Sequence, residues 1–230
     1  MVMAMLETPA APMPMLPGHA FFVGLDLGQT HDPTAVAVLE RATTLTGAID
    51  PVTFARASRT TLDVRHLERL PLGTPYPEVV RQVLARVTAL QGHGRTTVVV
   101  DATGVGAPVL DLLREEFRAA GLGGCPIAPV VITGGAQASR TGKAWHVPKR
   151  DLVQGLQLAL EQRELGIDGR LPACAALLRE LTTFRFRTTA AGADQFGVWR
   201  EGEQDDLVLA AALAVWQARQ APRGASGPLF

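Results

Sequence analysis

The sequence has 230 residues, of which 47% are hydrophobic and 5% aromatic, and its 22 basic and 22 acidic side chains give a net charge of zero. This composition excludes a disordered chain, and no apolar run reaches the roughly 18 residues that a transmembrane helix needs. Any contact with nucleic acid must therefore come from a local basic patch. Cys125 and Cys174 are too few for a disulfide framework and lack zinc-ligand partners, so we expect free thiols in a reducing cytoplasm.

Short apolar runs and helical spacing predict the elements in chain order. Strands are expected at residues 21–27, 34–40 and 52–58, a helix from Pro77 to residue 90, a strand at 96–100, a helix from Pro108 to residue 117 and a strand at 127–132. Next come a helix from Pro148 to Leu165 and a shorter helix over 173–181. A hairpin of 182–189 with 196–200 and a helix from Asp205 to Trp216 complete the order. This order predicts one α/β domain over residues 19–220, with helices on the faces of a mixed sheet. Residues 1–18 and 221–230 are expected to be disordered tails.

Acidic residues occupy the edges of three buried elements. Asp26 lies within the first strand, Asp101 ends the strand at 96–100, and Asp205 and Asp206 begin the last helix. A carboxylate inside a strand is costly unless it is paired or bound to a metal ion. Capping is the alternative role for the others, since an acid at a helix start contributes about 0.3–1 kcal/mol. Asp26 has no helix end to cap.

These acids gain a common role if the two strands are neighbours and the last helix packs on their sheet. Carboxylates a few ångströms apart repel one another unless divalent cations neutralise them. Oxygen ligands without a His or Cys cluster favour Mg²⁺ or Mn²⁺ over Zn²⁺. Two such ions, about 3.5–4 Å apart, hold the attacking water and the leaving oxygen of a phosphodiester in line. We therefore predict that Asp26, Asp101, Asp205 and Asp206 are catalytic metal ligands, and leave open which member of the last pair binds metal.

A second candidate site is basic. Arg140, Lys143, Lys149 and Arg150 lie within eleven residues that contain no acid, after a glycine-rich segment at 134–139. A flexible loop of this kind can contact DNA phosphates, and each contact adds salt dependence. A solvated surface loop is the alternative.

The strand predicted at 182–189 carries Arg185 and Arg187, which are two residues apart and so share one face. On that face they could extend the basic patch formed by residues 140–150. A polar outer sheet face is the more common explanation of such a pair.

Four motifs occur in a characteristic order: GLDLG at 24–28 with DPTA at 32–35, VVVDATGVG at 98–106, VPKRDLV at 147–153 and DDLVLA at 205–210. In this order and spacing they resemble the nuclease domain of phage large terminase subunits, from about residue 20 to 219. The catalytic acids of that family would fall on Asp26, Asp101 and the pair Asp205–Asp206. Gln204 departs from the family, which often has His there.

The resemblance implies an RNase H-like fold, akin to Holliday-junction resolvases, with helices on both faces of a mixed sheet. It implies a metal-dependent endonuclease that cuts double-stranded DNA during genome packaging, in the cytoplasm of a bacterial host. Low sequence specificity is expected, because no helix carries a set of base-reading side chains. Full large terminases also carry a packaging ATPase, to which no part of this sequence corresponds. A separate packaging ATPase or other phage proteins are therefore the expected partners beside DNA.

Two other functions fit parts of the sequence. Residues 23–30 (VGLDLGQT) are similar to the first phosphate loop of ATP-binding proteins of the actin, Hsp70 and sugar-kinase type. That fold needs two RNase H-like halves, and this chain has room for one. The other alternative is a catalytically weak DNA-binding remnant, against which the presence of every expected acid argues.

Overall fold

The computed structural model describes residues 18–28, 32–49, 56–104, 106–188, 194–197 and 204–221. Apart from Gly18 and Ala221, the tails predicted at 1–18 and 221–230 lie outside these ranges.

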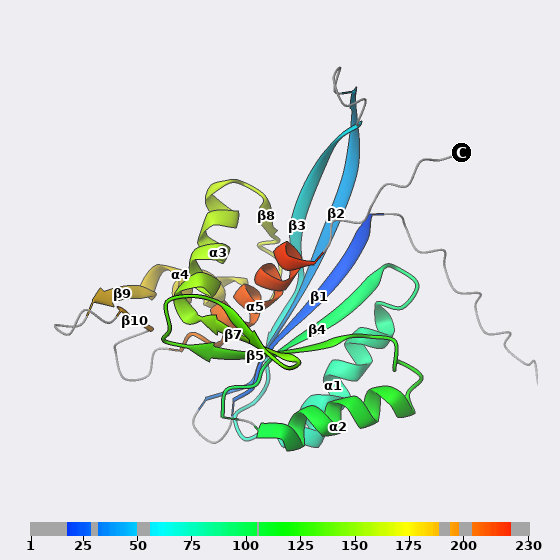
Figure 1. Ribbon diagram of the computed structural model, residues 1–230, viewed down its shortest axis with the longest axis vertical. Helices are drawn as coiled ribbons and strands as arrows, with labels where there is room; N and C mark the ends of the chain where they lie inside the picture. The colour runs from blue at the N-terminus through cyan, green and yellow to red at the C-terminus, as the bar shows by residue number, and fades with distance from the viewer. Residues whose placement is uncertain are drawn as a thin grey trace, which may run out of the picture.

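An eight-stranded mixed sheet forms the centre of the molecule (Figure 1). In spatial order its strands are β6 (Ser139–Thr141), β7 (Ala144–Pro148), β5 (Ile127–Thr133), β4 (Arg95–Asp101), β1 (His19–Asp26), β2 (Ala35–Ile49), β3 (Arg56–Arg69) and β8 (Leu165–Ile167). The first three strands of the chain form an antiparallel meander. β1 also pairs in parallel with β4, and β5 and β7 continue that parallel half. β9 (Arg185–Thr188) and β10 (Asp194–Gly197) form a separate antiparallel pair.

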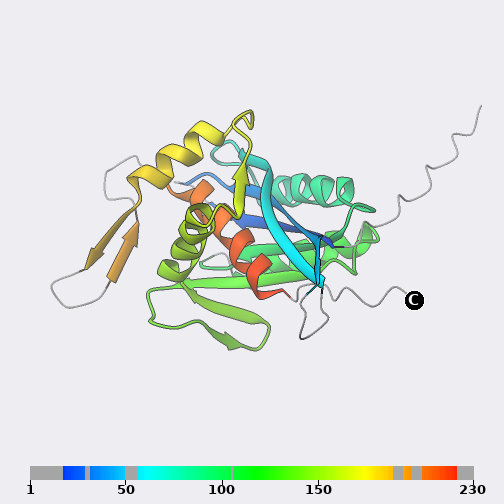
Figure 2. The same cartoon turned by 90° about the horizontal axis from the view of Figure 1, so that it is seen from above.

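Helices cover both faces of the sheet, as expected (Figure 2). α1 (Tyr76–Ala89) and α2 (Gly106–Ala119) pack on one face. α3 (Lys149–Glu161), α4 (Cys174–Thr183) and α5 (Asp206–Gln220) pack on the other. Each face has its own hydrophobic core, and the two cores share the sheet as a common wall within one mixed α/β domain. None of the helices in the described ranges is long and apolar enough to cross a membrane.

α5 is the helix that lies closest to the sheet. Every residue from Leu207 to Trp216 is buried, which marks a helix in the interior of the protein. It rests directly on β1, where a Cβ atom added to Gly24 would overlap the carbonyl oxygen of Ala210. The small residues of α5 and Gly24 thus allow the two backbones to touch, and this contact fixes where α5 begins.

The structure corrects three of the predicted elements. The third strand runs to Arg69, well beyond its predicted end at residue 58, because Leu62, Val64 and Leu67 are buried from this segment. Residues 52–55 of the prediction lie outside the described ranges. Leu165 begins β8 and does not end the third helix, since Arg163 adopts φ +55°, a left-handed conformation that stops a helix. The basic segment expected as a flexible loop forms the β6–β7 hairpin at the edge of the sheet.

The second predicted hairpin is present, with shifted bounds. α4 continues to Thr183, so that β9 begins at Arg185 and not at residue 182. β10 covers Asp194–Gly197, and residues 198–200 of the predicted strand lie outside the described ranges.

The contact between β1 and α5 predicts opposite effects of two Gly→Ala substitutions. Gly24→Ala should lower the free energy of unfolding by about 3 kcal/mol, because the new methyl group overlaps backbone atoms of α5. Gly155→Ala, in α3 with open space at its Cβ position, should raise it by roughly 0.5–1 kcal/mol. Urea unfolding of both variants measures the difference. Equal stability of the Gly24 variant and the wild type would contradict the packing described above.

Candidate active site

Asp26 and Asp101 lie side by side at one edge of the sheet. β1 and β4 are parallel neighbours in which Leu25 pairs with Val100, so the next residue of each strand is the aspartate. Leu25 and Val100 face α1 and α2. Because side chains alternate along a strand, the two aspartates face the opposite side, on which α5 lies. The two carboxyl groups lie close enough for each to affect the pKa of the other.

The start of α5 brings the other two acids to the same place. Asp205 is the N-cap residue and Asp206 the first residue of the helix. Burial, followed by the charges of Asp101, Asp205 and Asp206, raises the pKa of Asp26 well above its usual value. Burial also raises the pKa of Asp101. Four carboxyl groups far apart in the sequence therefore act on one another in a partly buried cluster, which we call the acid cluster.

Lys149 places a positive charge within the acid cluster. Its ammonium Nζ lies 2.6 Å from Oδ2 of Asp205 and 5.7 Å from the centre of the Phe184 ring. The same ammonium group lowers the pKa of both Asp26 and Asp101, although burial outweighs this effect. Lys149 is thus the counter-ion of three of the four acids.

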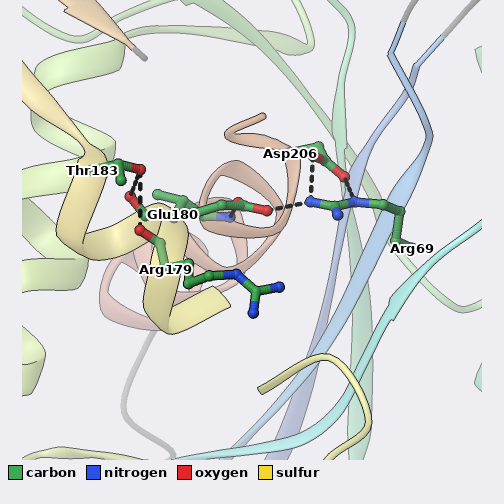
Figure 3. Close-up of polar contacts among 6 residues, drawn as sticks. Arg69, Arg179, Glu180, Thr183 and Asp206 are labelled. Carbon is green, nitrogen blue, oxygen red and sulfur yellow. Dashed lines mark hydrogen bonds and ion pairs between the residues drawn. The ribbon is translucent and has the colours of Figure 1, made fainter. Parts of the chain in front are cut away.

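Asp206 belongs to a second network (Figure 3). Arg69, the last residue of β3, donates Nε–H and Nη2–H to the two carboxylate oxygens of Asp206, at 2.7 and 2.9 Å. Arg69 also donates to Glu180 of α4. Glu180 Oε2 in turn accepts the backbone N–H of Val208 at 3.0 Å, near the start of α5. One guanidinium group thereby joins β3, α4 and α5 and fixes the orientation of Asp206.

The sequence analysis did not identify Arg69 or Glu180. Glu180 nevertheless carries a signal, because it follows Cys174 and Leu177 at intervals of three residues and so lies on the buried face of α4. A charged residue on an apolar helix face requires a partner. Arg69 gives no comparable signal, since nothing in its neighbourhood in the sequence indicates which acid it binds.

The donor atoms of the acid cluster are all carboxylate oxygens, which fit a hard divalent cation. Within the described ranges, however, no three Asp, Glu, His or Cys side chains are arranged to hold a metal ion. Asp205 is held by Lys149, and Asp206 by Arg69. Asp26 and Asp101 thus form a facing pair that fits a cation. Asp205 or Asp206 could add a third ligand only by leaving its present partner, Lys149 or Arg69.

The four basic candidates occupy different environments. Arg140 and Lys143 are exposed on the β6–β7 hairpin, and the guanidinium of Arg140 lies 5.2 Å from the ring centre of Trp145. Arg150 is half-buried and donates to the carbonyl oxygen of Ala136 at 3.0 Å. Lys149 lies in the acid cluster, so the structure does not bring the four together as one exposed patch.

Two further basic candidates, Arg185 and Arg187, lie on β9, and their side chains fall outside the described part of the structure.

Comparisons with known proteins show where this fold occurs. No protein-family model and no curated protein matches the sequence. Among solved structures, the large terminase nuclease of thermophilic phage G20c with bound magnesium is 25% identical, with a TM-score of 0.54 over 89% of this chain and 85% of that chain. The large terminase nuclease domain of Thermus phage P74-26 is 22% identical, with a TM-score of 0.53 over 94% and 87%. The manganese-soaked terminase nuclease domain of human cytomegalovirus is 10% identical, with a TM-score of 0.50 over 85% and 81%.

The fold is therefore RNase H-like, as the sequence motifs predicted. Within that class, the similarities support a DNA-cutting nuclease domain of the large-terminase type. The described residues form one RNase H-like sheet and not the two halves that the ATP-binding alternative requires.

The network around Arg69 predicts a dependence of stability on pH. One guanidinium group serves two buried carboxylates, and burial together with the charge of Asp206 raises the pKa of Glu180 to about 7. A carboxyl group with a raised pKa in the folded state stabilises the protein at low pH, and this contribution is lost as pH rises toward 7. Glu180→Gln, which keeps an acceptor for Val208, should reduce the loss of thermal stability between pH 5 and 8. An unchanged pH profile in this variant would contradict the assignment.

Proposed function

We propose that this protein is a metal-dependent endonuclease that hydrolyses phosphodiester bonds of double-stranded DNA with two Mg²⁺ or Mn²⁺ ions. The observation that carries the proposal is the convergence of Asp26, Asp101, Asp205 and Asp206 from β1, β4 and α5. The likeness to a terminase nuclease that holds magnesium, at 25% identity, supports the choice of ion and substrate. We further propose the role of such nucleases in phage DNA packaging within a bacterial cytoplasm, together with a separate packaging ATPase.

Each acid has a distinct place in this proposal. Asp26 and Asp101 face each other and would hold a divalent cation between them, since a cation relieves the repulsion between the two carboxylates. Asp205 lies at the open end of α5, where its carboxylate is 23% exposed and can turn toward the same cation. Asp206 is oriented by Arg69. When bound, divalent cations activate the attacking water and stabilise the charge on the leaving oxygen.

DNA would approach the acid cluster past the β6–β7 hairpin. We propose that Arg140 and Lys143 contact phosphates there, because both are exposed and neither forms an ion pair within the described residues. Lys149 and Arg150 begin α3 directly after β7 and are proposed to contact the phosphates nearest to the acid cluster. Contacts to phosphates alone give low sequence specificity.

Nicking of supercoiled plasmid tests the catalytic proposal. Wild-type protein should cut in Mg²⁺ or Mn²⁺ and not in EDTA. Asp26→Asn and Asp101→Asn should each reduce the rate at least about a hundredfold, because each removes a ligand of the cation. Asp111→Asn is the matched control: Asp111 is exposed on α2, on the far side of the sheet, and its loss should leave the rate unchanged.

Three results would contradict the proposal: cutting that persists in EDTA, equal rates for the wild type and Asp26→Asn, or DNA binding without any metal-dependent cutting. The last result would instead support a DNA-binding remnant.

DNA affinity measured against salt concentration tests the hairpin. Lys143→Ala should weaken binding and reduce the slope of log K against log salt by about 0.9, the value for one phosphate contact. Arg81→Ala is the control, because Arg81 is also exposed but lies on α1, on the opposite face of the sheet. If both substitutions change the slope equally, the hairpin is not the DNA-binding surface.

A further inference from the structure

Lys149 is placed unlike the other basic residues of its segment. It is the first residue of α3, where the helix dipole disfavours a positive charge. Its ammonium group nevertheless turns inward, to 2.6 Å from Asp205, and its side chain is only 23% exposed. Its placement is explained by the acids and not by its helix.

Charge balance gives the reason for this position. The acid cluster gathers four carboxyl groups, of which Asp206 is neutralised by Arg69. The remaining three, Asp26, Asp101 and Asp205, all interact with the ammonium of Lys149. Without that charge, three partly buried carboxyl groups would face one another with only protons to reduce their repulsion.

A divalent cation bound to these acids would meet the same three carboxylates. The ammonium of Lys149 contacts Asp205 at 2.6 Å, so a divalent cation that takes Asp205 as a ligand must compete with it for that carboxylate. We propose, building on the proposed function, that Lys149 is an internal counter-ion of the acid cluster, and that a divalent cation displaces its ammonium group from Asp205 in order to gain a third ligand.

The displacement gives Lys149 a second task. Once released from Asp205, the ammonium group would be free to turn toward the β6–β7 hairpin, since Lys149 directly follows the last residue of β7. There it is available to a DNA phosphate. Lys149 therefore acts as a positioning residue that holds Asp205 before the cation arrives and contacts DNA afterwards.

Binding of Mn²⁺ to the full chain, measured by isothermal titration calorimetry without DNA, tests this exchange. Lys149→Met keeps the apolar stem beside Phe184 and removes the charge. Its Kd for Mn²⁺ should be roughly tenfold lower than that of the wild type, because the competing cation is gone. Lys149→Arg keeps the charge and should retain the wild-type Kd. Asp26→Asn should abolish the measured binding in each background and thereby locate it.

The melting temperature, measured with and without Mn²⁺, shows whether each variant is folded and tests the exchange a second time. Without metal, Lys149→Met should unfold at a lower temperature than the wild type, and saturating Mn²⁺ should raise its melting temperature by more than it raises that of the wild type. If the Met variant does not fold, Lys149→Gln takes its place in both measurements.

The outcomes separate the inference from the function on which it rests. An equal or higher Kd in the uncharged variants, with binding that still depends on Asp26, overturns the displacement of Lys149 and leaves the nuclease proposal intact. Absence of Asp26-dependent Mn²⁺ binding in the wild type overturns both.

Discussion

Repulsion between buried carboxyl groups is the constraint on which the site depends. Asp26, Asp101 and Asp206 lose much of their hydration where β1, β4 and α5 meet, and burial raises the pKa of each. Such a cluster is costly unless positive charge accompanies it. The chain supplies two cations, Lys149 and Arg69, and they divide the acids between them. The folded protein thus holds carboxylate oxygen atoms close together, in an arrangement that a divalent cation can bind.

The fold makes this cluster possible through one close contact. The absence of a side chain at Gly24 lets α5 lie against β1, and the small residues of α5 fill the remaining space. Since β1 and β4 are parallel and in register, their terminal aspartates meet at the same edge. α5 then starts at that edge and adds its first two residues. The packing of apolar residues therefore decides where the acids meet.

Much of the fold could be predicted from the sequence because it depends on local patterns. The apolar runs of β1, β4 and β5 and the helical spacing of α1 and α3 are visible without a structure. The predicted ends of β3 and α3 were wrong. The register shift between Val38 and Leu39 and the left-handed conformation of Arg163 are set by tertiary packing and have no clear signal in the chain.

The acids of the site could be predicted as well, because a carboxylate inside an apolar strand is conspicuous. Their partners could not. Arg69 lies 137 positions from Asp206, and Lys149 lies 56 from Asp205, so only the fold brings them together. Lys149 looked like one member of a basic surface patch, whereas the structure turns it toward the acids. Sequence patterns identify which charged groups need a partner, and three-dimensional packing determines which residue that partner is.

The most direct test of the central claim is a crystal of the protein soaked in Mn²⁺ and examined by anomalous scattering. The account predicts anomalous peaks bounded by the carboxylates of Asp26 and Asp101, with Asp205 turned away from Lys149 toward the ion. A map without a peak at these residues, in which Asp205 and Asp206 keep Lys149 and Arg69 as their partners, would contradict it.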